Sequence, residues 1–319
     1  MLEIIMLIIG FAIIIKSADL LVDTASSLAI KCHLPKMLIA LTIVSFGTCA
    51  PEIAIAFQSI ASKNGEIAFA NIIGSCVVNV FFIIGLACVI RPIKLKHKTV
   101  KKELPILLPI TTVFSILMID STFNPATPND FSRADGVVLI LIFFIFVLYL
   151  LQLIKNRDKT SVDENVNIKF ENPFIAILLL IVSLALITFS SDLIVDSATS
   201  LATKLNISEK IITMVLIAIG TSLPEMITTV TSARKGEFDI AIGNIIGTNI
   251  FNICIVLGLP ISIYGGIELQ GFNLIDIIAI FASSFILYVF AKNDNEISRK
   301  EGIAMITIFV VYYAYLLLQ

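Results

Sequence analysis

Two copies of one short polar motif stand in otherwise apolar sequence. Gly47-Thr48-Cys49-Ala50-Pro51-Glu52 returns 173 residues later as Gly220-Thr221-Ser222-Leu223-Pro224-Glu225. In each copy the proline lacks a backbone N–H, so the carbonyl four residues earlier loses its helical partner and is available as a ligand. The Thr and the Glu are four residues apart, which places a hydroxyl and a carboxylate on one helix face. The motif therefore predicts an oxygen-lined cation site.

A second polar segment follows each motif at the same offset. Ser75 and Asn79 correspond to Thr248 and Asn252, again four residues apart. The combined set contains two carboxylates, hydroxyls, amide oxygens and freed carbonyls, with no histidine or thiolate duplicated between the copies. Calcium takes about 6–8 oxygen ligands, whereas zinc, copper and iron prefer nitrogen or sulfur. Two glutamates balance the charge of one Ca²⁺, of two protons or of Na⁺ ions, so the site suits an exchanger.

The elements that position these residues are membrane-spanning helices. The chain has 319 residues, of which 58% are hydrophobic and only 14% charged, against about 25% charged in a soluble domain. A helix needs about 20 mostly apolar residues to cross a bilayer. We predict an all-α polytopic membrane protein with ten transmembrane helices, near residues 2–25, 35–61, 66–90, 104–120, 134–154, 174–198, 209–232, 238–263, 272–291 and 301–318.

The repeat extends over nearly the whole chain. The offset of 173 also pairs Asp19 with Asp192, and the last spans align at an offset of 166. We therefore predict a first five-helix repeat at 1–154, a linker at 155–172 and a second five-helix repeat at 173–319. Because five is odd, the second repeat is inverted in the membrane relative to the first, as in many secondary transporters.

The basic residues predict the orientation. Of the 22 Lys and Arg, 17 fall on one set of loops, and four fall on the opposite loops and the termini. The positive-inside rule then places the Arg91–Lys102 loop and the linker in the cytoplasm and both termini outside a cell membrane. The first residues carry Glu3 and no basic region, so we interpret them as the first span and not as a signal peptide.

Several function classes are disfavoured. The five cysteines are odd in number and have no metal-type spacing, so neither a disulfide framework nor a cofactor is implied. There is no basic face for nucleic acid, and nothing implies an obligate protein partner. An intramembrane hydrolase would need a nucleophile and a base, but the chain has no Gly-x-Gly-Asp motif and its two histidines, His33 and His97, lie in loops. A transporter, and not an enzyme, is expected.

Gly-Thr-x-x-Pro-Glu followed by Asn-x-x-Gly-Ser/Thr-x-x-x-Asn, present twice, resembles the alpha repeats of the sodium/calcium exchanger family of calcium:cation antiporters. The resemblance covers almost the whole chain and implies that Glu52 and Glu225 are the central ion ligands. It further implies oxygens from Thr48, Thr221, Ser222, Ser75 and Thr248, flanking sodium sites completed by the backbone carbonyls of Ser45 and Ala218, and a middle lined by Asn79 and Asn252.

Two positions depart from the family pattern. Cys49 stands where the family has a serine, matching Ser222, which weakens one hard oxygen position of a flanking sodium site. Asn252 stands where potassium-dependent members carry aspartate, which argues against potassium co-transport. The resemblance implies a secondary antiporter that moves Ca²⁺ out against entering Na⁺ through the bilayer, with the first and sixth spans as the moving gate. An H⁺/Ca²⁺ antiporter and a passive cation channel are the alternatives.

Overall fold

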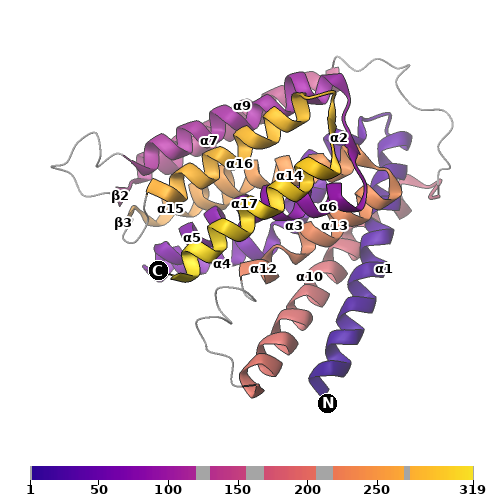
Figure 1. Ribbon diagram of the computed structural model, residues 1–319. Helices are drawn as coiled ribbons and strands as arrows, with labels where there is room; N and C mark the ends of the chain where they lie inside the picture. The colour runs from indigo at the N-terminus through magenta and orange to yellow at the C-terminus, as the bar shows by residue number, and fades with distance from the viewer. Residues whose placement is uncertain (1, 120–129, 156–168, 206–217, 269–273, 319) are drawn as a thin grey trace.

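Helices form at every predicted span. The computed structural model describes residues 2–119, 130–155, 169–205, 218–268 and 274–318 (Figure 1). With η marking π-helical segments, the first half contains α1 (Leu2–Lys31), α2 (Lys36–Ile39), η1 (Ala40–Val44), α3 (Ser45–Thr48), α4 (Ala50–Ala61), α5 (Gly65–Val77), η2 (Val78–Ile84), α6 (Gly85–Ile90), η3 (Thr99–Glu103), α7 (Leu104–Met118) and α9 (Arg133–Lys155). The second half contains α10 (Pro173–Lys204), α12 (Ala218–Thr221), α13 (Leu223–Lys235), α14 (Phe238–Phe251), η5 (Asn252–Leu257), α15 (Gly258–Tyr264), α16 (Leu274–Lys292) and α17 (Arg299–Leu318).

The predicted all-α, multi-pass architecture is confirmed. Within the described residues, six helices are long and apolar enough to cross a membrane, or seven if the bent pair Lys36–Thr48 and Ala50–Ala61 counts as one span. The predicted seventh span, 209–232, is described only from residue 218 onward, and its earlier part lies outside the described residues. The boundaries differ most at α1 and α10, which are 30 and 32 residues long and outlast their predicted ends.

The two repeats are inverted, and α1 and α10 make this visible. These helices lie side by side and extend together away from the rest of the bundle (Figure 1). Lys204 near the end of α10 pairs with Glu3 at the start of α1. Lys169 just before α10 pairs with Asp23 toward the other end of α1, at 2.8 Å. The first helices of the two halves are therefore antiparallel, as the odd number of spans per repeat requires.

Glycines let each half pack its last helix against the third span of the other half. A Cβ on Gly85 would lie 2.9 Å from the carbonyl oxygen of Gly302, and one on Gly136 would lie 2.8 Å from that of Gly258. These two contacts correspond under the repeat. Backbones approach this closely only where side chains are absent, as at small-residue interfaces of membrane helices. The two repeats thus interlock.

Two short antiparallel ribbons repeat this exchange at the ends of the bundle. β1 (Ile93–Lys94) pairs with β4 (Glu296–Ile297), and β2 (Asp130–Phe131) pairs with β3 (Ile267–Glu268). Each ribbon joins the segment after one half's third span to the segment before the other half's last span. The ribbons thereby hold the same two helices that the glycines bring together.

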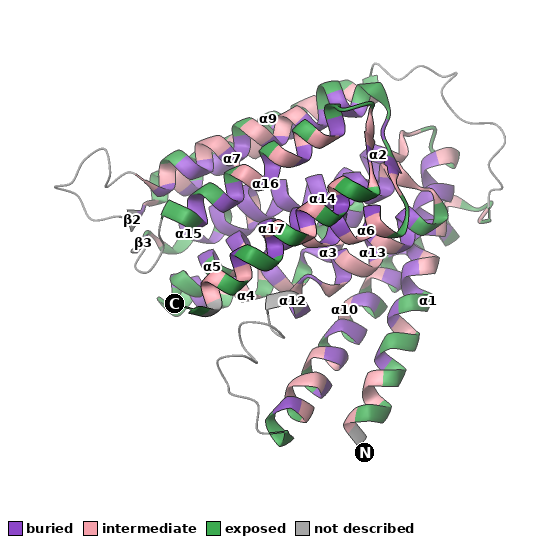
Figure 2. Cartoon of the chain, in the orientation of Figure 1, coloured by how far each residue is buried: buried purple, intermediate pink, exposed green. Residues whose placement is uncertain are grey.

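The buried core lies around α5 and α14, which position the polar segments. Figure 2 shows α14 almost entirely buried, whereas α1 and α10 carry many exposed residues. Large exposed apolar side chains gather on the outer helices, for example Ile8 on α1, Phe144 on α9 and Leu178 on α10. An apolar exterior around a polar interior is what a bilayer requires.

Candidate cation-binding site

Both Pro-Glu motifs break a helix. The helical run from Lys36 ends at Thr48 and restarts at Ala50 with a bend of 50°. Cys49 at this break has φ −74° and ψ 1°, and Ser222 at the corresponding break has φ −91° and ψ 8°. Neither residue has helical backbone angles, which agrees with the loss of a donor at the following prolines.

The acidic residues follow directly from these breaks. Glu52 lies in the first turn of α4 and Glu225 in the first turn of α13. The N-terminal end of a helix favours negative charge. The sequence therefore places both carboxylates where the backbone stabilises them, in corresponding positions of the two halves.

Three π-helical segments flank the same region. Asn79 lies in η2, Asn252 begins η5 and Ser45 follows η1 directly. The hydroxyl of Ser45 donates to the carbonyl of Ala40, five residues earlier, at 2.6 Å. π-Helical turns are rare and occur most often at functional sites. Here they turn polar side chains toward the interior.

The side chains of Glu52 and Glu225 are fully buried. The hydroxyl of Ser75 lies 3.5 Å from Glu52 Oε1. Among the described residues, Glu52 Oε2 and both carboxyl oxygens of Glu225 have no hydrogen-bond partner. Two buried acids without counter-charges cost several kcal/mol each, so this arrangement requires cations or protons.

Hydroxyls and amides around the acids connect the two halves reciprocally. Thr48 Oγ1 lies 3.4 Å from Asn244 Oδ1, and Thr221 Oγ1 lies 3.3 Å from Asn71 Oδ1. These contacts are related by the repeat, and each pairs a residue of one half with a residue of the other.

Further hydroxyl contacts connect the two halves. Thr48 Oγ1 lies 3.5 Å from Thr248 Oγ1, and the hydroxyl of Ser222 donates to that of Ser75 at 3.4 Å. The sulfur of Cys49, which replaces a second hydroxyl, lies 3.9 Å from the carbonyl oxygen of Thr248. These contacts bring Thr48 next to Thr248 and Ser222 next to Ser75, and the copies differ at Cys49.

The asparagines behave unequally. Asn79 Nδ2 donates to Asn249 Oδ1 at 2.9 Å, and Asn249 Nδ2 donates to the carbonyl of Cys76 at 3.3 Å. Asn79 Oδ1 and both amide atoms of Asn252 are buried without a partner among the described residues. Sequence reasoning missed Asn249, because the offset of 173 pairs it with Cys76 and leaves no duplicated polar signal.

The two residues expected to contribute backbone carbonyls are described to different extents. The carbonyl of Ser45 accepts from the backbone N–H of Cys49 at 3.1 Å and from the hydroxyl of Thr48 at 3.1 Å. Ala218 begins α12, and its surroundings before that point lie outside the described residues. The carbonyl of Ser45 is thus hydrogen-bonded to two residues of the motif in its own half.

The donor set identifies the class of cation. No group of three or more His, Cys, Asp or Glu side chains within the described parts of the chain could hold a metal ion. The site instead offers two carboxylates among neutral hydroxyl and amide oxygens. Such a set suits hard cations that accept mixed oxygen ligands and exchange them readily.

Comparisons with known proteins agree with this chemistry. The family model described as sodium/calcium exchanger protein matches residues 2–152 and 175–318. The inner membrane protein YrbG of Escherichia coli (strain K12) is 32% identical over 98% of this chain and 95% of its own length. The sodium/calcium exchanger MaX1 of Methanosarcina acetivorans is 28% identical over 96% of both chains. The solved structure of the sodium/calcium exchanger from Methanococcus jannaschii superimposes with a TM-score of 0.81 at 27% identity, covering 98% of both chains.

Proposed function

This chain belongs to the sodium/calcium exchanger protein family, and on that premise we propose that it exchanges Ca²⁺ for Na⁺ at a site built around Glu52 and Glu225. Membership of the family makes it a multi-pass membrane antiporter of calcium and another cation. The proposal adds the identity of the second cation, the site residues and the direction, with Ca²⁺ leaving the cytoplasm as Na⁺ enters.

The observation that supports the proposal is the full burial of one acidic side chain from each half, with oxygens left without hydrogen-bond partners among the described residues. Ca²⁺ neutralises the two charges by binding both acids at once. Na⁺ ions do the same by occupying the carboxylates and the flanking hydroxyls separately. Because an unoccupied pair is costly to bury, the site changes sides of the membrane only when filled, and exchange follows.

The inverted repeat supplies the means of alternating access. Each acid follows a helix break in its own half, and the halves run in opposite directions through the membrane. A movement that opens one half toward the cytoplasm has a counterpart that opens the other half outward. We assign the moving gate to α1 and α10, whose contacting residues form an apolar cluster separate from the main core.

Sodium is favoured as the counter-ion by the neutral donors. Protons would need only the two carboxylates, whereas Ser75 places a hydroxyl oxygen 3.5 Å from Glu52 and Thr48 and Thr248 bring two more hydroxyl oxygens within 3.5 Å of each other. Hydroxyl and carbonyl oxygens are ligands of hard metal cations. The relative MaX1 is named a sodium/calcium exchanger, which also favours sodium as the counter-ion.

Proteoliposomes loaded with Na⁺ and diluted into sodium-free buffer containing radioactive Ca²⁺ test the proposal. Calcium should accumulate, and the uptake should vanish when Na⁺ inside is replaced by choline. Uptake that follows an imposed pH gradient and ignores Na⁺ would identify an H⁺/Ca²⁺ antiporter. Calcium flux that does not depend on any counter-ion inside the vesicles would identify a channel.

A further inference from the structure

Two cavities at opposite ends of the bundle are related by the repeat. One, of about 660 Å³, is lined by residues 60 and 63–67 and by residues 264–267. The other, of about 550 Å³, is lined at the corresponding residues 236–239 and also by the ends of neighbouring spans. We call them the neutral cavity and the basic cavity. The basic cavity lies on the face of the Arg91–Lys102 loop, which the proposed orientation places in the cytoplasm.

A row of lysines borders the basic cavity. Lys94, Lys96 and Lys98 occupy alternate positions between β1 and the start of η3, all three are exposed, and all three line the cavity. Lys96 pairs with Asp239 at 2.7 Å, and Lys36 on the opposite wall pairs with Glu237 at 2.7 Å.

Within the described residues, Lys94 and Lys98 form no ion pair within 4 Å. The lysines paired with carboxylates cancel, which leaves Lys94 and Lys98 against one remaining lining acid, Glu103.

Helix ends add to this positive field. The helical runs 36–48, 99–118 and 238–264 all begin at residues that line the basic cavity. The start of a helix carries a partial positive charge and unpaired N–H groups, which favour anions. Three such starts around one cavity, together with the lysines, form a site for a negatively charged group.

A buried acid inside the cavity supplies a further polar contact. Glu103 is 4% exposed, accepts a hydrogen bond from Tyr149 at 3.3 Å, and leaves its Oε2 without a partner. Burial raises the pKa of this carboxyl, and a backbone hydrogen bond, nearby Lys98 and the Tyr149 hydroxyl oppose part of the effect. In its protonated form the group donates a hydrogen bond into the cavity and does not repel an anion.

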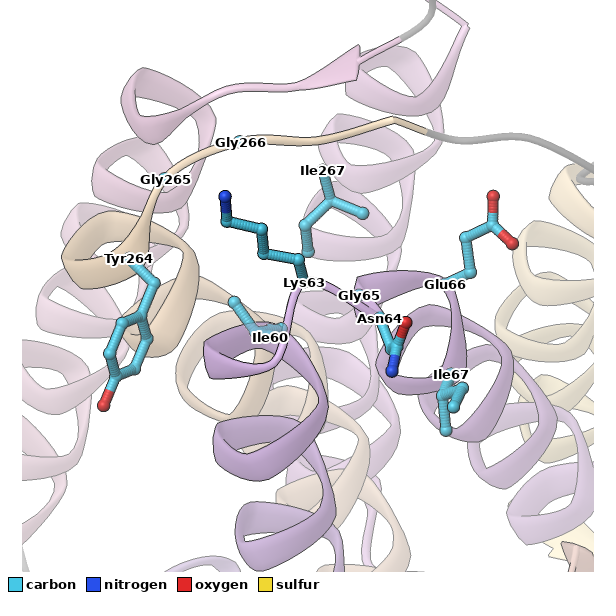
Figure 3. Close-up of a pocket in the computed structure, with 10 residues that line it drawn as sticks. All are labelled: Ile60, Lys63, Asn64, Gly65, Glu66, Ile67, Tyr264, Gly265, Gly266 and Ile267. Carbon is cyan, nitrogen blue, oxygen red and sulfur yellow. The ribbon is translucent and has the colours of Figure 1, made fainter.

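The neutral cavity gives the contrast. Its charged lining residues are Lys63 and Glu66, which cancel. Figure 3 shows Lys63 extending toward the loop that carries Gly266, and Glu66 turned away from it. The two cavities therefore occupy corresponding places in the two repeats, and only the basic cavity is lined by more positive than negative side chains.

We propose that the basic cavity binds the phosphate headgroup of an anionic phospholipid, at a site distinct from the transport site. The walls match both parts of such a molecule. The end of α1 and the start of α2 supply Ile30, Leu34 and Met37 to an apolar wall, and the lysine row faces the aqueous side. A free anion would gain nothing from that apolar wall, whereas a lipid uses both.

The absence of tryptophan from the chain allows a direct test. A single tryptophan introduced by Leu34→Trp reports lipid contact in the basic cavity through quenching by brominated lipids in vesicles. Brominated phosphatidylglycerol should quench it at a mole fraction about thirtyfold lower than brominated phosphatidylcholine does, as expected for two lysines near a membrane surface at about 1 kcal/mol each. Ile67→Trp, at the neutral cavity, should show no such preference. Equal quenching by both lipids at Leu34→Trp would overturn the proposal.

Charge variants in the Leu34→Trp background separate a site from diffuse attraction. Lys94→Gln/Lys98→Gln should abolish the preference for phosphatidylglycerol. Lys101→Gln/Lys102→Gln removes two exposed charges from the same segment outside the cavity and should retain it. An equal loss in both variants would mean that only general surface charge acts. Displacement of the brominated lipid by millimolar inorganic phosphate would assign the cavity to a free anion and contradict the lipid proposal.

Discussion

Glu52 and Glu225 carry the proposed chemistry, and their amide isosteres separate ion binding from folding. Glu52→Gln or Glu225→Gln should abolish sodium-driven calcium uptake, because loss of one partner of a buried charged interaction costs about 3–5 kcal/mol, at least about a hundredfold in affinity. Each variant should purify and elute like the parent chain, because glutamine has nearly the same shape, Glu52 Oε2 and both Glu225 carboxyl oxygens have no hydrogen-bond partner among the described residues, and the amide oxygen of Glu52→Gln can still accept from Ser75. Glu103→Gln, which changes a buried acid elsewhere, is the matched control and should transport. Calcium exchange retained in both site variants would refute the assignment.

Cys49 tests the asymmetry of the site. Cys49→Ser should lower the sodium concentration for half-maximal exchange about two- to tenfold, because a hydroxyl is a harder ligand than a thiol and one such contact contributes about 0.5–1.5 kcal/mol. Ser222→Cys, the mirror change in the other half, should raise that concentration. Sodium-dependent uptake in proteoliposomes measures both. An unchanged sodium dependence in Cys49→Ser would show that this position does not ligate sodium.

The raised pKa of Glu103 predicts a pH-dependent stability. This group precedes the fourth span, and burial raises its carboxyl pKa above the ordinary value of 4.5. The protonated acid is favoured in the folded chain, so its stabilising contribution is complete below pH 4.5 and is lost as the pH rises through the raised pKa. Glu103→Gln keeps an acceptor for Tyr149 and should melt at a higher temperature than the parent at neutral pH, with the gap closing on acidification. A gap independent of pH would contradict this explanation.

At the scale of helices, the glycine contacts predict which glycines cannot be replaced by a larger residue without loss of stability. Gly85→Ala and Gly136→Ala put a Cβ within 3 Å of a backbone carbonyl, which cannot move aside as a side chain can, and should destabilise by about 1–3 kcal/mol. Gly74→Ala is the matched control in the same span as Gly85, because the nearest atom to its Cβ would be Tyr313 Oη at 4.0 Å. Thermal unfolding in detergent compares them. Equal stability of the three variants would mean that the interlock contributes little.

How far the sequence predicted these elements depends on the signal each one leaves. Long apolar segments and duplicated prolines predicted the spans and the breaks at Cys49 and Ser222, because hydropathy and a missing N–H are local properties. The π-helical segments around Asn79 and Asn252 left no such signal, since they arise from packing between halves. Gly85 packs against the backbone of another helix and Gly74 has room beside it for a Cβ, a difference that depends on tertiary contacts and not on the local sequence. The tyrosine-bound acids Glu103 and Asp276 are also 173 residues apart, so the repeat could have revealed them.

At the scale of the whole molecule, interlocking links the two halves of the site. Each half holds the other's last helix through glycines and a ribbon, and each pairs its threonine with the other's asparagine. A half separated from its partner would therefore lose both its packing and half of its ligands. The repeats act as one unit, and the proposed site takes its ligands from both of them.

The orientation of this unit follows from its charges and can be read from a native residue. Cys32 is exposed, whereas Cys49, Cys76, Cys88 and Cys254 are buried, so a membrane-impermeant maleimide reports on one thiol. Cys32 lies in the loop between the first two spans, on the face with most of the basic residues. It should resist labelling in intact cells and react in inside-out vesicles.

The matched control places a thiol on the opposite face. Lys63→Cys in a Cys32→Ser background should label with the reverse pattern, because Lys63 is exposed in the loop after α4. Labelling of Cys32 from outside intact cells would show that the molecule has the opposite orientation in the membrane. The basic cavity would then face outward, and the positive-inside rule would have failed for a chain whose 22 basic residues are concentrated on one face. The proposed direction of calcium movement would then need a different argument.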